Sequence, residues 1–171
     1  GALIAAQSHL DLLPGIADGT VIITPAWLEP NNGFGPRGVQ IEAQPSGDQV
    51  VINGTKQHVY FASSATWLLV LARTGSSPEA IDLFLVDPHA PGVTLTQKMS
   101  ISSDTQYRVD FDHLSIPNAQ RVTTGGTGWA AWQAAMTEVM ILAAAFANGA
   151  AEHALDITVE YAKTREQFDK P

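Results

Sequence analysis

Residues 49–60 read QVVINGTKQHVY, and this stretch decides the architecture of the middle of the chain. Two β-forming runs, 49–52 and 57–61, lie on either side of Asn53-Gly54. Asn-Gly accepts the positive φ angles of a tight turn, so the pattern predicts a hairpin at this point. Ser-Gly-Asp at residues 46–48 predicts a second turn just before it.

Apolar and alternating runs extend this β region in both directions. Residues 67–72 (WLLVLA) and 81–86 (IDLFLV) are short and mostly apolar, which is typical of central strands covered on two sides. In residues 109–116 the alternation changes phase at Asp112-His113, as a β-bulge requires. Several short strands separated by turns predict an antiparallel β-barrel or sandwich over about residues 20–122.

The two ends of the chain have a helical character. Residues 1–19 begin as a helix that Pro14-Gly15 and Gly19 are expected to break. Beyond the glycines at 125–128 the apolar residues follow a helical period, and a helix over 127–168 would be roughly 60 Å long. Residues 139–147 are apolar all round, so we expect neighbours from further sequence or from other subunits to cover them. The predicted fold class is α+β: an antiparallel β-barrel or sandwich followed by a long α-helix from a helical bundle.

Composition limits the possible functions. The 171 residues have a net charge of -8, 45% hydrophobic residues and no cysteine. These values indicate a globular chain, disfavour nucleic acid as a partner and exclude disulfides and cysteine-ligated metals. The apolar run 139–147 is shorter than a bilayer span of about 20 residues, so no membrane insertion is expected. We expect a cytoplasmic protein, and the start at Gly1 without methionine suggests a piece of a longer one.

Two motifs are weighed and set aside. Residues 33–38 match the dinucleotide-binding pattern G-x-G-x-x-G, but that pattern functions where it opens a helix, whereas Pro36 and the residues after it predict a strand. Glu152, Asp156 and Glu160 lie on one helix face beside His153, which indicates a solvated acidic stripe more readily than a metal site. No metal is therefore predicted.

A series of short motifs in register resembles the acyl-CoA dehydrogenase family over almost the whole chain. They are WLEP (27–30), VINGTK (51–56), LFLVD (83–87), PGV (91–93), KM (98–99), VDFD (109–112), IP (116–117), ALD (154–156), YA (161–162) and REQF (165–168). The resemblance implies that residues 1–19 end an N-terminal helical domain. It also implies a middle β-barrel at 20–122 and the first helix of a C-terminal helical bundle at 123–171.

The resemblance further implies an FAD-dependent enzyme that oxidises an acyl-CoA thioester to the 2,3-enoyl-CoA. An electron-transfer flavoprotein would accept the electrons, and the protein would form a homo- or hetero-oligomer. The barrel would supply one wall of the FAD site, built from Trp27, Leu28, Gly33, Phe34, His58 and Tyr60. Arg165 and Phe168 match family residues that reach the FAD of the neighbouring subunit.

The chain departs from the family pattern at the wall itself. Leu28 and Phe34 stand where the family has Thr and Ser, and His58 and Tyr60 stand where it has Trp and Thr or Ser. Asp169 occupies the place of a glycine. These changes leave two hypotheses open: a dehydrogenase, or a non-catalytic or half-site subunit with a degenerate flavin site in a heteromeric complex. A third, a β-barrel interaction module, is disfavoured by the motifs of the flavin wall.

The catalytic base has one candidate within the chain. In most family members the catalytic Glu lies in a region that would follow Pro171, and in a minority it lies on the first helix of the C-terminal domain. The register places Val139 at this second position and Glu138 one residue before it, about 100° round the helix. Glu138 is therefore the candidate base, and the 171 residues alone are expected to be inactive.

Overall fold

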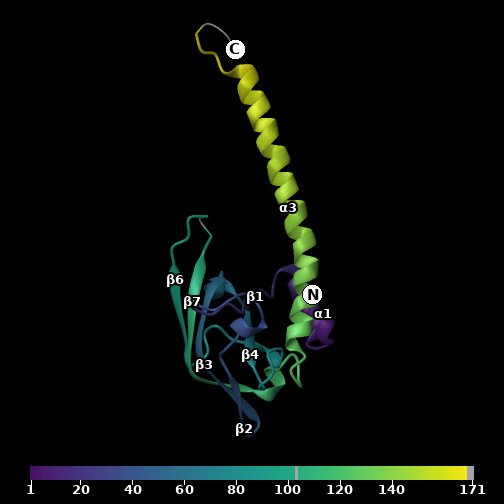
Figure 1. The fold of residues 1–171 in the computed structure, drawn as a ribbon, viewed down its shortest axis with the longest axis vertical. Coiled ribbons are helices and arrows are strands. Elements are labelled where there is room, and N and C mark those ends of the chain that lie inside the picture. Colours follow the sequence, from purple (N-terminus) through teal and green to yellow (C-terminus); the bar gives the residue numbers. More distant parts are fainter. Residues whose placement is uncertain (103, 169–171) are drawn as a thin grey trace.

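The computed structural model describes residues 1–102 and 104–168. A short helical segment, seven strands in two β-sheets and one long helix make up these residues (Figure 1). The helix predicted at the N-terminus is interrupted at Gln7 and His9, which have positive φ angles, and not at Pro14 as predicted. Pro14 lies in the first turn of the next helix, where a missing N–H costs no hydrogen bond. The helices are α1 (Ala2–Ala6), α2 (Leu13–Asp18) and α3 (Gly128–Thr164), and the strands are β1 (Ile23–Ala26), β2 (Ala43–Ser46), β3 (Gln49–Tyr60), β4 (Trp67–Arg73), β5 (Ile81–Val86), β6 (Val93–Lys98) and β7 (Gln106–Pro117).

The strands form a three-stranded sheet in the order β1-β4-β5 and a four-stranded sheet in the order β2-β3-β7-β6. All neighbouring pairs are antiparallel except β1 and β4, which run parallel. The smaller sheet buries both of its faces. One face packs on the larger sheet through Val70 and Phe84, and the other packs on α1 and α3 through Leu71 and Leu83. This burial on both faces explains why consecutive side chains of β4 and β5, which point to opposite faces of the sheet, are mostly apolar.

The hairpin predicted at Asn53-Gly54 is wrong, because β3 runs without interruption from Gln49 to Tyr60. Its partner β7 continues beside both halves, and the pairing shifts register between Ile52 and Gly54. Gly54 has a φ of +136°, and an added Cβ would lie 2.4 Å from Ile41 Cγ2. Between these pairs Asn53 alone lies opposite Asp112 and His113, so Asn-Gly forms the β3 side of a β-bulge in β7 instead of a turn.

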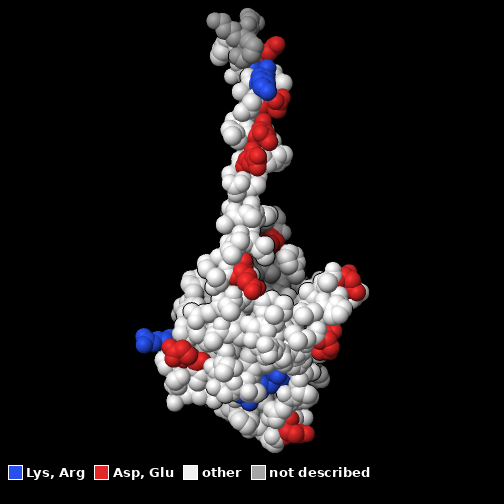
Figure 2. Space-filling model, turned by 90° about the vertical axis from the view of Figure 1, so that its right-hand side faces the viewer, with Lys and Arg blue, Asp and Glu red and all other residues white. Residues whose placement is uncertain are grey.

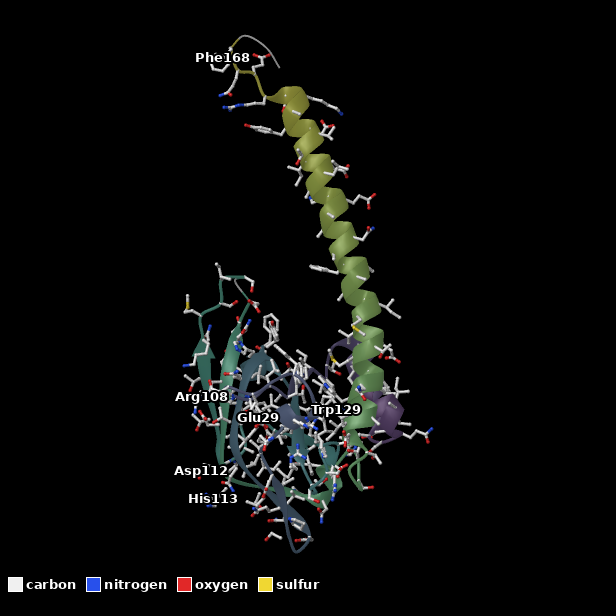
Figure 3. All side chains as sticks on the ribbon, in the orientation of Figure 1. Glu29, Arg108, Asp112, His113, Trp129 and Phe168 are labelled. Atoms are coloured by element: carbon white, nitrogen blue, oxygen red, sulfur yellow. The ribbon has the colours of Figure 1, made fainter. Side chains whose placement is uncertain are left out.

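The other two local predictions are confirmed. Ser46 pairs with Gln49 across a two-residue turn, which makes β2 and β3 the hairpin. The phase change in β7 falls at Asp112-His113 (labelled in Figure 3), which form a β-bulge opposite Asn53 of β3. The His113 N–H donates to Asn53 Oδ1 at 2.6 Å, so both irregularities belong to one structure.

Helix α3 extends far beyond the rest of the molecule (Figure 1). Its 37 residues correspond to a length of about 55 Å. Gly128, Trp129, Ala131, Trp132 and Ala135, in its first turns, are its buried residues. Further along, Val139, Met140, Ile141, Leu142 and Phe146 are exposed. The predicted α+β class with a long C-terminal helix is thus confirmed.

The apolar character of α3 extends beyond the stretch 139–147. By length and composition alone the helix could cross a membrane, with an 18-residue window of mean hydropathy 1.4. Core helices of soluble proteins satisfy the same criterion, so this property does not identify a membrane span. It does show that α3 carries far more apolar surface than α1 and the two sheets cover.

Candidate cofactor wall

Two segments far apart in the sequence meet where β1 ends and β3 ends. Residues 27–29 leave β1, and residues 56–60 form the last part of β3. Thr24 Oγ1 donates to the carbonyl oxygen of Tyr60 at 2.7 Å, which joins the two strands. Trp27, Leu28, His58 and Tyr60, four of the residues predicted to face the cofactor, thus belong to two adjoining segments.

Three successive carbonyl groups hold residues 27–29 against β3. Lys56 Nζ donates to the carbonyl oxygen of Trp27 at 3.3 Å, and the Gln57 N–H donates to that of Leu28 at 2.9 Å. Gln57 Nε2 donates to the carbonyl oxygen of Glu29 at 3.2 Å. We call these three hydrogen bonds the carbonyl clip. They fix every peptide carbonyl of the segment on two adjacent residues of β3.

A buried ion pair lies behind the clip. Lys56 Nζ lies 2.8 Å from Glu29 Oε1, with side-chain exposures of 0% and 4% (Figure 3 labels Glu29). Burial lowers the pKa of Lys56 to about 8, and the Glu29 carboxylate opposes this shift. The pair was not predicted, although Lys56 falls on the inward-facing phase of β3 between buried residues, which is a detectable signal.

The Glu29 carboxylate also closes the loop that follows it. Both of its oxygens accept the Gln40 N–H at 3.0 Å, and Oε1 accepts the Ile41 N–H at 3.1 Å. Asn32 Nδ2 donates to Oε2 at 3.1 Å. The loop between these contacts carries Gly33 and Phe34, so the remaining predicted wall residues depend on the same carboxylate.

Aromatic side chains connect this wall to α3. The ring centroids of Trp27 and Trp132 are 5.4 Å apart, and those of Trp27 and Phe34 are 6.0 Å apart, both pairs tilted. Such tilted contacts are a favourable aromatic geometry. Phe34 is 74% exposed, so the row formed by Trp132, Trp27 and Phe34 ends in an aromatic ring that faces solvent. Neither Phe34 nor Leu28 carries a side-chain hydrogen-bonding group.

His58 and Tyr60 are both exposed at the end of β3. His58 has a φ of +54° and lies at a second register shift, between Lys56 and Val59. Its Nδ1–H donates to Gln106 Oε1 at 2.8 Å, so β7 orients the imidazole. Tyr60 keeps 46% of its surface open and is the hydroxyl-bearing side chain among the predicted wall residues.

The structure does not bring Arg165 and Phe168 near this wall. They lie past the end of α3, at the opposite extremity of the molecule (Figure 3 labels Phe168). Arg165 lies over the Tyr161 ring at 5.9 Å, and Phe168 is 95% exposed. Within one chain these two residues are therefore separate from the other predicted cofactor residues. Asp169 lies outside the described residues.

Glu138 is also separate from the wall. Its carboxylate is 70% exposed, and Oε2 lies 3.9 Å from the Gly1 amino group, next to α1. No hydrogen bond or ion pair joins it to the wall among residues 1–102 and 104–168. Its role as a base stays a prediction.

The motifs set aside on sequence grounds occupy positions that explain their patterns. Residues 33–38 form a loop ending in one 3₁₀ turn, and extended residues follow, with no helix for a pyrophosphate. An added Cβ on Gly38 would lie 1.8 Å from the Gly33 carbonyl oxygen, which accounts for that glycine. The acidic residues of the distal half of α3 form an exposed stripe (Figure 2). No group of three metal-ligating side chains occurs in the described part of the chain.

Comparison with known proteins establishes the family. The family model "Acyl-CoA dehydrogenase, middle domain" matches residues 25–114, and "Acyl-CoA dehydrogenase, C-terminal domain" matches residues 126–171. The chain belongs to the acyl-CoA dehydrogenase family, as its sequence motifs indicated.

Individual relatives agree with this assignment. The chain is 32% identical over 171 residues to probable acyl-CoA dehydrogenase YngJ of Bacillus subtilis, covering 96% of this chain and 44% of the relative. A putative acyl-CoA dehydrogenase structure from Mycobacterium smegmatis superposes with a TM-score of 0.90 at 27% identity, covering 100% of this chain and 47% of that one. A glutaryl-CoA dehydrogenase from Mycobacterium smegmatis in complex with FADH2 gives 0.81 at 28% identity, covering 94% and 42%. The chain thus spans less than half the length of these relatives.

Proposed function

We propose that this chain is part of an FAD-dependent acyl-CoA dehydrogenase, in which the barrel supplies one wall of the cofactor site. The observation that supports the proposal is the carbonyl clip. It holds the end of β1 against the end of β3, so that residues from both segments form one fixed surface beside α3. A flat cofactor needs a preorganised surface of this kind.

The residues present fit one side of an FAD site. Trp27 and Phe34 offer aromatic surface, Gly33 offers backbone without a side chain, and Tyr60 offers an exposed hydroxyl. Leu28 would contribute its backbone groups to the site, and His58 would contribute the edge of its imidazole ring. Arg165 and Phe168, at the far end of α3, would contact the FAD of a neighbouring subunit in an oligomer.

When bound, FAD supplies a hydride acceptor for the carbon next to the one that loses a proton. The protein's task is to place an acyl-CoA thioester against it, exclude water and provide a carboxylate for the proton. Glu138 is the candidate within this chain, and the family resemblance places the usual base after Pro171. We further propose an electron-transfer flavoprotein as the electron acceptor.

One observation favours the second hypothesis, a degenerate flavin site in a heteromeric complex. Leu28 and Phe34 lack the hydroxyl groups that the family pattern has at these positions, and Phe34 exposes its ring there. If this wall no longer binds FAD well, the chain would serve as a non-catalytic or half-site subunit beside an intact partner.

FAD titration of the full-length apoprotein decides between the two. The test variant carries Leu28→Thr, Phe34→Ser, His58→Trp and Tyr60→Thr, and Leu10→Thr, an exposed leucine outside the wall, is the control. A competent site predicts stoichiometric binding at sub-micromolar FAD and weaker binding by the variant, because the present side chains are adapted to the cofactor. A degenerate site predicts the reverse, a gain of about one to two orders of magnitude from two recovered hydrogen bonds.

A further inference from the structure

We propose that Glu29, Lys56 and Gln57 are positioning residues of the cofactor wall: the buried ion pair and the carbonyl clip orient the wall for FAD and do more than stabilise the barrel. This inference rests on the proposed function. The three residues touch neither cofactor nor substrate in the proposal. They act through the segments that they hold.

The first argument is that one ion pair anchors all three wall segments. Lys56 and Gln57 hold residues 27–29, and they directly precede His58 in β3. The Glu29 carboxylate holds both ends of the loop that carries Gly33 and Phe34, through Asn32 on one side and Gln40 and Ile41 on the other. A displacement of this pair would move the three segments together.

The second argument concerns orientation. One hydrogen bond would suffice to tether a strand end, but the clip engages three successive carbonyls. Fixing adjacent carbonyls fixes the planes of adjacent peptide groups, because each peptide unit is rigid. These planes carry the N–H groups of Leu28 and Glu29, and Leu28 lies between two of them, so the directions of both N–H groups and of the Leu28 side chain follow from the clip. The clip therefore specifies which groups this segment presents to a ligand.

The third argument concerns the chemical nature of the pair. Removing two charges from water is costly, and a buried pair can often be replaced by apolar residues with no loss of stability. Lys56 and Glu29 are almost fully buried, although most of the buried residues of the chain are apolar. Its directional hydrogen bonds give the wall a defined geometry, which apolar packing would not.

The matched control is a second buried ion pair, away from the wall. Arg121 Nη2 lies 2.5 Å from Asp82 Oδ2, and the Asp82 side chain is fully buried. This pair fixes the connection into α3, and in the described structure neither residue makes a hydrogen bond or ion pair with residues 27–29 or 56–60. Arg121→Met thus removes one partner of a buried pair without changing the clip.

The experiment uses the full-length protein and measures FAD affinity, the visible circular dichroism of bound flavin, and stability to urea. The variants are Lys56→Met, Gln57→Ala, the neutral pair Glu29→Gln with Lys56→Met, and Arg121→Met. We expect Lys56→Met and Gln57→Ala to weaken FAD binding about 10-fold and to alter the flavin dichroism. Arg121→Met should lose stability and keep both flavin readouts.

The neutral pair separates positioning from stability. We expect it to regain most of the stability lost in Lys56→Met and to keep the weakened affinity and altered dichroism, because the lysine clip bond is still missing. The inference is overturned if the neutral pair recovers FAD affinity together with stability. It is also overturned if Lys56→Met and Gln57→Ala bind FAD as tightly as the wild type. Amide exchange of residues 27–32 in the apoproteins gives a readout without cofactor, and we expect it to accelerate about 10-fold in Lys56→Met but not in Arg121→Met. A wild-type protein that takes up no FAD refutes the proposed function and leaves the clip a purely structural feature.

Discussion

Asp82 is the residue whose loss should most weaken the junction between the barrel and α3. Its carboxylate accepts hydrogen bonds from Arg121 at 2.5 Å, Thr74 at 2.8 Å, Thr123 at 2.9 Å and the Gly126 N–H at 3.2 Å. Residues 121–126 connect β7 to α3, so this one side chain fixes the path into the helix. Asp82→Ala would leave Arg121 and the buried Thr123 without this acceptor.

The expected cost follows from the burial of the group. Breaking a buried ion pair by removing one partner destabilises by about 3–5 kcal/mol, a large part of the 5–15 kcal/mol typical of a domain. Asp82→Asn keeps one acceptor oxygen and should cost less, about 1–3 kcal/mol. The control is Asp110→Ala, which removes a partly exposed pair with Arg108 and should cost at most about 1 kcal/mol.

Urea unfolding followed by tryptophan fluorescence measures these differences, because Trp129 and Trp132 lie at the base of α3. The pH dependence provides a second check. Burial on its own would raise the pKa of Asp82, but the hydrogen bonds from Arg121, Thr74, Thr123 and Gly126 outweigh it and hold the pKa below its ordinary value. A carboxyl with a lowered pKa stabilises the folded state above its unfolded pKa and loses this contribution as the pH falls through its folded pKa.

The stability gap between wild type and Asp82→Asn should therefore be full at pH 7 and shrink below about pH 4. Equal costs for Asp82→Ala and Asp110→Ala would refute the assignment of Asp82 as the anchor of this junction. A gap that stays constant down to pH 2 would refute the ionised carboxylate as its cause.

Two further predictions concern the bulge and the long helix. Gly54→Ala should destabilise the protein by about 1–3 kcal/mol in thermal or urea unfolding, because φ is positive there and the new Cβ would meet Ile41; a change within 0.5 kcal/mol would show that the bulge relaxes freely. The exposed apolar residues 139–147 should make the protein self-associate, and Met140→Glu with Phe146→Glu should reduce the association in analytical ultracentrifugation. A wild-type monomer at micromolar concentration, with the helix intact by circular dichroism, would contradict the second expectation.

The strands were predictable where burial alone determines the pattern. The runs at 67–72 and 81–86 are apolar in both phases because the smaller sheet packs on both sides, and no long-range information is needed to read this. Asn53-Gly54 misled because Gly54 does have a positive φ, but it has it inside a continuous strand that faces a bulge of β7. The pairing of β3 with β7 along its whole length decides between bulge and turn, and a single sequence does not reveal that pairing.

The candidate site was predictable only in part, for a similar reason. The family motifs identified Trp27, Leu28, His58 and Tyr60, which the fold brings to two adjoining segments. They did not reveal the Glu29–Lys56 pair, whose members are 27 residues apart and meet only when β1 and β3 pack together. Arg165 and Phe168 matched the same motifs, but a straight helix carries them away from the wall.

Because α3 is long and is packed only at its base, a small rotation there produces a large displacement at its C-terminal end. A rotation of about 5° at the base of a helix about 55 Å long displaces its tip by about 5 Å, more than the length of a hydrogen bond. Only the first turns of α3 are packed against the rest of the chain, so this packing cannot by itself place Arg165 and Phe168 with the accuracy that ligand binding demands. If these residues serve the cofactor of another subunit, the surrounding subunits must supply that accuracy. Cofactor loading would then depend on protein concentration, since dilution that separates the subunits would also dismantle the binding site.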